Sequence, residues 1–156
     1  MRFLLLIISF ASFIGFSQDE KEQSIKWYDF ESAIDANEED KKPLFIDIYT
    51  TWCGWCVKMD NSTFKDPKVV SYMNEHFYAV KMDAESKDAI AFKKKLYESK
   101  TYGSKTYNEL AYNLLGGRMS FPTFVVLSKR QVKIGTINGF KKPKELLSIL
   151  SKYENK

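Results

Sequence analysis

Short apolar runs alternate along this chain with stretches in which apolar residues recur at helical spacing. The short runs are rich in β-branched and aromatic residues and predict strands at 44–49, 77–83, 121–127 and 132–138. Helical spacing predicts helices at 26–37, 53–60, 67–75, 85–98, 106–115 and 143–150. Strands that alternate with helices in this way predict an α/β fold, in which helices flank a central mixed β-sheet.

The first seventeen residues have the pattern of an export signal. Arg2 precedes an apolar run at 3–16, and the small residues Gly15 and Ser17 fit the −3 and −1 positions of a cleavage site. The sequence therefore predicts a signal peptide at 1–17 and an exported protein. An uncleaved N-terminal membrane anchor is the alternative, although the apolar run is short for a bilayer span.

The remaining chain has the composition of one globular domain. The polar residues 18–25 predict a flexible lead-in, and 26–156 then form the domain. The net charge of +4 is spread along the chain without a dense basic stripe, so it does not indicate a nucleic-acid partner. Two cysteines and one histidine exclude both a closed four-ligand zinc site within one chain and a multi-disulfide scaffold.

Candidate chemistry lies at Cys53 and Cys56, which two residues separate at the start of the predicted helix 53–60. Unpaired N–H groups at a helix N-terminus stabilise a thiolate and lower the pKa of a thiol placed there. Cys53 is therefore the predicted attacking thiol, and Cys56, one turn into the helix, would resolve a mixed disulfide. A plain stabilising disulfide is one alternative, but the short ring that it would close between Cys53 and Cys56 gains little loop entropy. Half of a zinc site shared between two chains is the other alternative.

Two residues near the cysteines also have candidate roles. Asp47 lies inside an apolar strand, where a buried carboxylate is costly. Burial would raise its pKa and make it a proton acceptor for Cys56, through a water molecule; a satisfied buried polar group is the alternative. Trp52 either packs beside the cysteines as a structural residue or contacts the substrate.

The residues around this motif resemble the thioredoxin superfamily, and in particular its exported thioredoxin-like branch. The run 45–56, which ends in Cys-Gly-Trp-Cys, is similar to that family's strand and active-site sequence. Within the family pattern Asp47 occupies the position of a buried acid and Lys81 that of a buried lysine, with a solvated strand residue as the alternative for Lys81. Phe121-Pro122 resembles the cis-proline segment, and Gly139 the glycine after the last strand.

The resemblance implies a thiol-disulfide oxidoreductase that reduces or isomerises protein disulfides. It implies catalytic roles for Cys53, Cys56, Asp47 and Lys81, and it implies no metal, nucleotide or flavin cofactor. The implied substrate-binding face consists of Trp52, Gly54, Trp55, Phe121, Pro122 and Gly139. Protein disulfides are the implied partners, a membrane-embedded thiol reductase is the implied electron donor, and the bacterial periplasm is the implied location. The alternative function is a non-catalytic thioredoxin-like module that holds a protein partner on the Pro122 face.

One segment departs from the family pattern. Lys81 and Pro122 are 41 positions apart, which is more than one crossover helix requires. The predicted helix 106–115 matches the family's own helix, so the surplus lies at about 84–105. The helical spacing at 85–98 predicts a helical insertion before the cis-proline. We expect this insertion to border the groove at the cysteines and to narrow the range of substrates.

Overall fold

The computed structural model describes residues 24–156. The predicted signal peptide at 1–17 lies outside the described residues, as does most of the predicted lead-in at 18–25. The end of that lead-in is not a flexible tail, because the side chain of Ile25 is 4% exposed and packs in the hydrophobic core. The sequence interpretation missed this because one apolar residue among polar ones gives no periodic signal.

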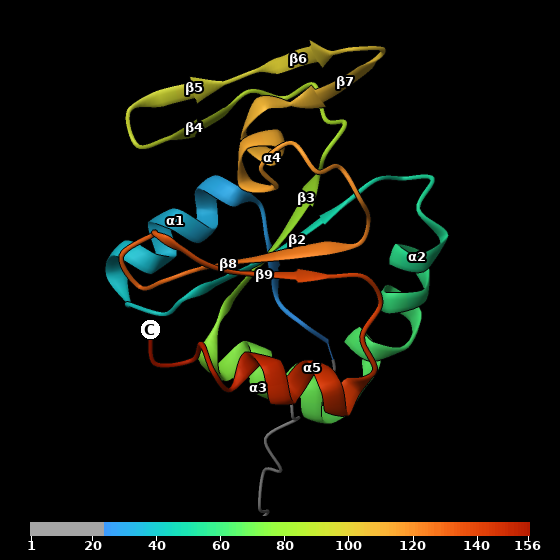
Figure 1. The fold of residues 1–156 in the computed structure, drawn as a ribbon. Helices are drawn as coiled ribbons and strands as arrows, with labels where there is room; N and C mark the ends of the chain where they lie inside the picture. Colours follow the sequence, from blue (N-terminus) through green and yellow to red (C-terminus); the bar gives the residue numbers. More distant parts are fainter. Residues whose placement is uncertain (1–23) are drawn as a thin grey trace, which may run out of the picture.

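A five-stranded mixed sheet forms the centre of the domain, in the order β1-β3-β2-β8-β9 (Figure 1). Its strands are β1 (Trp27–Tyr28), β2 (Leu44–Tyr49), β3 (Tyr78–Asp83), β8 (Thr123–Leu127) and β9 (Lys133–Asn138). The first three are parallel to one another, and β8 and β9 are antiparallel to their neighbours. The predicted α/β class, with a mixed sheet flanked by helices, is confirmed.

Helices cover both faces of this sheet. The helical elements are α1 (Phe30–Glu39), α2 (Gly54–Asn61), a short 3-10 helix (Thr63–Lys65), α3 (Pro67–His76), α4 (Glu109–Leu114) and α5 (Pro143–Leu150). Apolar residues of α1 and α4 pack on one face of the sheet, and those of α2, α3 and α5 pack on the other. Each face therefore has its own buried apolar cluster.

Strand β2 divides its side chains between these two clusters. Ile46 and Ile48 belong to the cluster under α1 and α4, whereas Phe45 belongs to the cluster under α2, α3 and α5. Because side chains alternate along a strand, Asp47 points to the same face as Phe45. The alternation of side chains along β2 therefore places the Asp47 carboxylate beneath α2, the helix that carries the cysteines.

The N-terminal helix is shorter than its spacing predicts. Residues 26–37 were expected to be helical, but Trp27 and Tyr28 form β1 and pair with β3. Helix α1 begins only at Phe30, because Asp29 is its N-cap and accepts a hydrogen bond from the backbone N–H of Ser32. An aromatic residue at helical spacing is equally compatible with a short edge strand.

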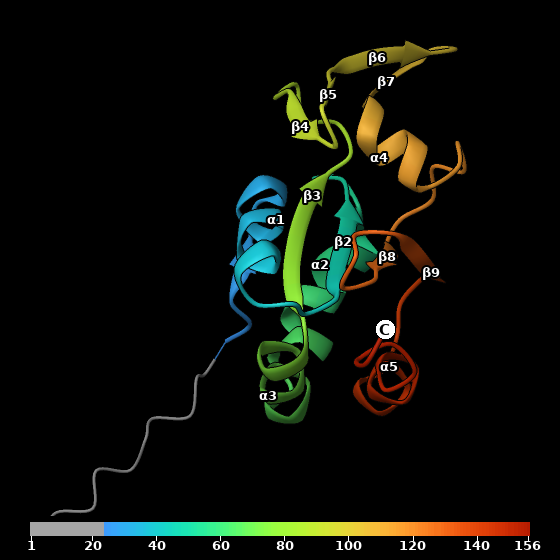
Figure 2. The same cartoon turned by 90° about the vertical axis from the view of Figure 1, so that its left-hand side faces the viewer.

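The predicted helical insertion is wrong, because this segment consists of two β-hairpins. The first pairs β4 (Ile90–Phe92) with β5 (Lys95–Tyr97), and the second pairs β6 (Ser99–Tyr102) with β7 (Lys105–Asn108). The first three residues of the predicted helix 106–115 also belong to a strand, β7, and α4 starts at Glu109. Figure 2 shows the hairpins at one end of the sheet, beyond α4.

Local backbone geometry explains why a helix does not form there. Lys93 and Lys94 both have positive φ angles, 50° and 63°, and make the tight turn of the first hairpin. Gly103, with a φ of 63°, makes the turn of the second. Three consecutive lysines give no sequence signal for left-handed backbone, so the spacing of the apolar residues predicts a helix instead.

The hairpins are fastened to the domain at several points. Phe92 packs edge-to-face on Phe30 with ring centroids 5.1 Å apart, and the backbone N–H of Ala91 donates to Glu31 Oε1 at 2.8 Å. Asn108 is fully buried at the junction with α4, where its Oδ1 accepts from the Leu110 N–H and its Nδ2 donates to the Asp88 carbonyl. The insertion is therefore packed against the domain as part of it.

Replacing Asn108 tests how far the hairpins depend on this junction. Asn108→Ala removes the α4 cap and leaves the Asp88 carbonyl without its donor, so we expect a loss of about 1–3 kcal/mol in the free energy of unfolding. Urea unfolding measures this loss, and hydrogen exchange should show faster exchange of the hairpin amides. Asn113→Ala, on the exposed side of α4, is the matched control; equal stability of both variants would contradict the assignment.

Candidate active site

Cys53 and Cys56 are joined by a disulfide at the N-terminus of α2. Cys53 is the N-cap residue, and the backbone N–H of Cys56 donates to Cys53 Sγ at 3.1 Å. The N–H of Cys53 donates in turn to the Thr50 carbonyl, which ties the cysteine to the end of β2. The predicted position of Cys53, at the junction of strand and helix, is confirmed, and the sulfur lies where N–H groups and the helix dipole favour negative charge.

The two cysteines differ in their surroundings. Cys53 is 5% exposed and Cys56 2% exposed, and Cys56 lies on the inner side of α2 with Met59. Residues four apart share one face of a helix, so Asp60 lies on the same side of α2 as Cys56. This places a second carboxylate on the face of the helix that covers β2.

A three-membered ionic cluster lies beneath α2. Lys81 Nζ, from β3, donates to Asp47 Oδ2 at 2.7 Å and to Asp60 Oδ1 at 2.5 Å. Since one ammonium group contacts both carboxylates, the cluster links β2, β3 and α2. Asp60 was missed by the sequence interpretation, although its spacing of four residues from Cys56 was a signal that could have found it.

Lys81 is held by aromatic rings as well as by carboxylates. Its ammonium lies 5.0 Å from the ring centre of Trp27, 4.9 Å from Tyr49 and 5.6 Å from Phe64. Ring faces attract a cation and are apolar, so they restrict the lysine without competing for its hydrogen bonds. The structure therefore gives Lys81 a partner in the buried site, and it is not a purely solvated strand residue.

Burial controls the charge state of Asp47. The side chain is 1% exposed, and burial raises the pKa of Asp47 from 3.8 to about 6, although the charge and hydrogen bond of Lys81 act in the opposite direction. Burial lowers the pKa of Lys81, but the contacts with Asp47 and Asp60 outweigh it and raise that pKa overall. Asp47 Oδ1 is buried without a hydrogen-bond partner among the described residues, so one oxygen is available to accept a proton.

Aromatic side chains surround the cysteines on the outside. Trp52 is 61% exposed; its Nε1–H donates to Glu85 Oε2 at 2.9 Å and its ring packs edge-to-face on Phe121 at 5.8 Å. Trp55, between the cysteines, is 56% exposed and packs against Phe140 at 5.7 Å. Trp52 is thus both packed on one side and open to solvent on the other.

The remaining predicted residues line the same edge of the sheet. The Phe121–Pro122 peptide bond is cis, and the Pro122 carbonyl accepts a hydrogen bond from the Gly139 N–H at 2.8 Å. Gly139 adopts a φ of 74°, which a glycine accommodates without strain. Gly54, the first residue of α2, has open space where a Cβ would lie. The structure therefore brings together the cysteine segment, the Pro122 segment and the insertion through Trp52.

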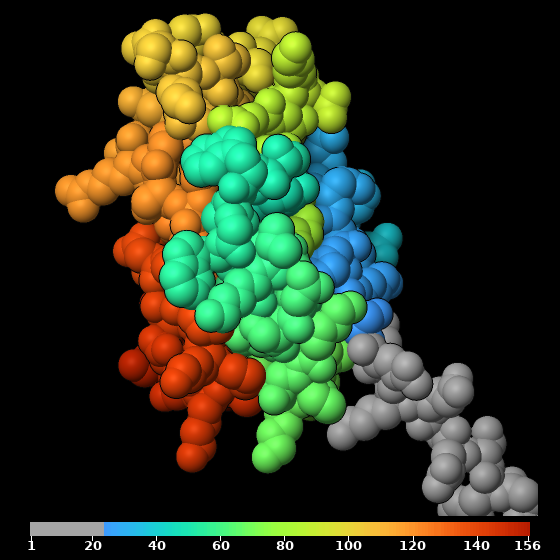
Figure 3. All heavy atoms as spheres, turned by 90° about the vertical axis from the view of Figure 1, so that its right-hand side faces the viewer, coloured from blue at the N-terminus to red at the C-terminus, as the bar shows by residue number. Residues whose placement is uncertain are grey.

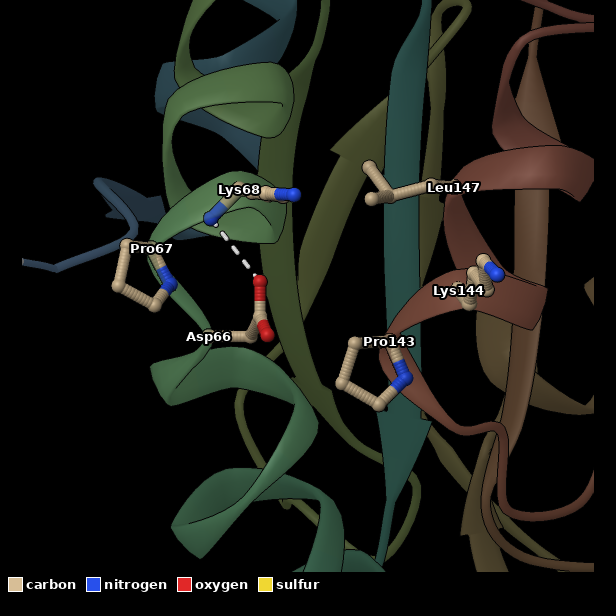
Figure 4. Close-up of a pocket in the computed structure, with 6 residues that line it drawn as sticks. All are labelled: Asp66, Pro67, Lys68, Pro143, Lys144 and Leu147. Carbon is tan, nitrogen blue, oxygen red and sulfur yellow. Dashed lines mark hydrogen bonds between the residues drawn. The ribbon is translucent and has the colours of Figure 1, made fainter.

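An apolar cleft of the domain lies elsewhere. It has a volume of about 360 Å³ and lies between the first turns of α3 and α5 (Figure 4). Its lining consists of Asp66, Pro67, Lys68, Pro143, Lys144 and Leu147. Asp66 Oδ1 already accepts from the Lys68 N–H, as the dashed line shows, and the cleft contains no nucleophile. It has no part in the chemistry of the cysteines.

The described residues contain neither a metal-binding cluster nor a membrane-spanning helix. Within residues 24–156, no cluster of three or more histidine, cysteine, aspartate or glutamate side chains is arranged to bind a metal ion. Among the helices of the same residues, none has the length and apolar character needed to cross a bilayer.

Comparison with solved structures identifies the fold. A thioredoxin from Thermus thermophilus matches with a TM-score of 0.61 and 19% identity, covering 83% of this chain and 86% of that one. The DsbH oxidoreductase matches with a TM-score of 0.56 and 16% identity, covering 82% and 83%. A putative disulphide-isomerase from Bacteroides thetaiotaomicron matches with a TM-score of 0.56 and 24% identity, covering 81% and 89%. The chain therefore has a thioredoxin-like fold.

Sequence comparison then gives the family. Residues 11–107 match the Thioredox_DsbH family, described as "Protein of unknown function, DUF255", and the chain belongs to this family. Disulfide bond reductase DsbH of Chlamydia pneumoniae is 24% identical over 67 residues, 42% of this chain and 40% of that protein. Spermatogenesis-associated protein 20 of Rattus norvegicus is 28% identical over 64 residues, 40% of this chain and 8% of that protein. The matched segments thus span less than half of each relative.

The raised pKa of Asp47 predicts a specific dependence of stability on pH. Because the folded state binds the Asp47 proton more tightly than the unfolded chain, the stabilisation from that proton is complete below about pH 4 and is lost as the pH rises to about 6. In the oxidised protein, Asp47→Asn should therefore raise the free energy of unfolding above that of the wild type when the pH exceeds 6. The expected gain is up to about 3 kcal/mol, reduced by the stabilisation that Lys81 loses with its ion-pair partner.

Urea unfolding of both oxidised proteins between pH 3 and pH 8 measures this difference. Asp35→Asn, which removes an exposed carboxylate from α1, controls for the loss of a surface charge. A stability advantage of Asp47→Asn that is largest at low pH would contradict a raised pKa.

Proposed function

We propose that this protein is an exported thiol-disulfide oxidoreductase that reduces or isomerises protein disulfides through Cys53 and Cys56. The observation that carries the proposal is the position of the disulfide, which joins the N-cap of α2 to a buried cysteine above the Asp47 cluster. A staple would need neither the helix N-terminus nor a costly buried carboxylate. The matches to DsbH and to a putative disulphide-isomerase support the same chemistry.

The first step is attack on the substrate. In the reduced protein, the Cys53 thiolate attacks one sulfur of a substrate disulfide, and the substrate S–S bond breaks as the bond to Cys53 Sγ forms. The departing substrate sulfur leaves as a thiolate and takes up a proton from solvent. The N–H of Cys56, which points at Cys53 Sγ at 3.1 Å, stabilises the attacking thiolate.

The second step releases the substrate. The Asp47 carboxylate takes the proton of the Cys56 thiol, and the resulting thiolate attacks Cys53 Sγ. The mixed disulfide breaks, the second substrate thiolate leaves, and the Cys53–Cys56 disulfide forms. Two electrons have then passed from the dithiol to the substrate. A thiol reductant must restore the dithiol, and we propose a membrane-embedded thiol reductase for this role.

The residues around the disulfide position the substrate. In this proposal, Trp52, Trp55 and Phe121 supply apolar contacts, the backbone at Pro122 pairs with the substrate chain as an added strand would, and Gly54 leaves open space for the substrate beside Cys53. Gly139 keeps the adjacent segment close to Pro122 through its hydrogen bond. Lys81 positions the Asp47 carboxylate. The export motif at 1–17 supports a location outside the cytoplasm, in the periplasm of a bacterium, where disulfides persist.

The second candidate function is a non-catalytic module that holds a protein partner on the Pro122 face. The exposed tryptophans favour it, because exposed aromatic residues commonly contact protein partners. The buried Asp47 and the paired cysteines have no role in that function. It predicts binding that is independent of the cysteines.

Single-cysteine variants separate these functions. Cys56→Ser removes the resolving thiol, so Cys53 should form a mixed disulfide with a protein disulfide such as insulin, and mass spectrometry should find the adduct on Cys53 alone. The matched variant Cys53→Ser should form no adduct and lose turnover by a factor on the order of 10³ or more, because the nucleophile is gone. Adduct formation on Cys56 of Cys53→Ser would reverse the assigned roles, and binding without thiol-dependent turnover in the wild type would favour the module.

A further inference from the structure

An aromatic patch lies around the disulfide on the outer surface. We define it as Trp52, Trp55 and Val57, which are 61%, 56% and 51% exposed, together with the half-buried rings of Phe121 and Phe140 that support the tryptophans. Most other large apolar side chains of the described residues are covered. An exposed patch of this kind marks a contact surface rather than a part of the core.

Cations lie against the aromatic patch from two sides. Lys58 Nζ, from α2, lies 4.8 Å from the Trp55 ring centre and 5.2 Å from that of Phe140. Lys105 Nζ, from the second hairpin, lies 5.9 Å from the Trp52 ring centre. Both lysines are exposed and neither has an ion-pair partner among the described residues. Their charges are therefore available to a bound molecule.

The hairpins bring positive charge to this edge of the sheet. Segment 84–109 contains six lysines against four acidic residues, and two of the lysines, Lys95 and Lys100, form ion pairs with one of those acids, Glu109. Another of those acids, Glu85, holds the Trp52 indole through its hydrogen bond, and is the carboxylate that contacts the aromatic patch. Figure 3 shows the cysteine segment (teal) directly beside the hairpins (yellow-green to yellow) on one face of the molecule. The entrance to Cys53 is thus apolar at its centre and mainly cationic at its rim.

We infer that this surface selects, among the protein disulfides of the proposed function, those whose flanking residues are acidic and apolar. Apolar side chains of the substrate would cover Trp52 and Trp55, and carboxylates on either side would meet Lys105 and Lys58. Long-range attraction between the hairpin lysines and an acidic chain also raises the rate of encounter. The inference rests on the proposed function and adds the chemical class of its substrate.

The test compares two disulfide peptides that differ only in charge. Both contain the same disulfide and the same flanking leucines, with three glutamates in one and three lysines in the other. The rate constant for oxidation of the reduced protein by each peptide is divided by the rate constant for dithiothreitol with the same peptide, which removes differences in intrinsic reactivity. We expect the acidic peptide to react at least about fivefold faster at low salt, and the ratio to fall at high salt.

Paired variants assign this preference to the two lysines. Lys58→Gln with Lys105→Gln should lower the ratio toward one, whereas Lys58→Arg with Lys105→Arg keeps both charges and should preserve it. Lys152→Gln with Lys156→Gln removes two exposed charges near the C-terminus, which lies on the side of the domain away from α2, and should also preserve it (Figure 1). A preference that survives the Lys58 and Lys105 glutamine variants would overturn the inference.

The outcomes separate the inference from the function on which it rests. If wild-type protein reduces neither peptide nor the neutral disulfide of 2-mercaptoethanol, the proposed function fails. Equal reduction of both peptides contradicts the inference and leaves the function standing. Equal reduction together with sedimentation of the protein on vesicles of phosphatidylglycerol would assign the aromatic patch to a membrane surface instead.

Discussion

The contact between Asp47 and Lys81 is the interaction on which the rest of the site depends. A carboxylate within a sheet of apolar side chains would be costly without a partner, and Lys81 from the adjacent strand supplies one at 2.7 Å. Asp60 extends the contact to α2, so the cluster joins both central strands to the helix that carries the cysteines. The proton affinity of Asp47 is therefore set by the same packing that positions Cys56.

The parallel arrangement of β2 and β3 explains why the site lies where it does. Their carboxyl ends meet at one edge of the sheet, so the loop to Cys53 and the start of the insertion emerge side by side. Glu85, two residues beyond β3, reaches Trp52 directly before Cys53. The insertion thus contributes to the surface around the disulfide without contributing to its chemistry.

The sequence predicted the central strands, the start of a helix at Cys53 and the buried position of Asp47, because each depends on local spacing or on burial within one run. It did not predict the hairpins, since their turns use positive φ angles at Lys93 and Lys94 that no hydrophobic period encodes. It also did not predict the contact of Asp60 with Lys81. A charged residue on a helix is expected to face solvent, and the contact joins that helix to a separate strand. Local patterns therefore predict the chemistry, while partners from distant segments require the fold.

The equilibrium reduction potential of the Cys53–Cys56 pair tests the central claim most directly. When both carboxylates are ionised, the cluster of Asp47, Asp60 and Lys81 carries a net negative charge on the face of α2 that holds Cys56, which opposes a thiolate there and favours the disulfide over the reduced form. We predict a potential in the more reducing half of the range from about −270 mV for thioredoxin to about −120 mV for a strong oxidant. Equilibration with glutathione or dithiothreitol measures it, and a value above about −150 mV would contradict a reductase.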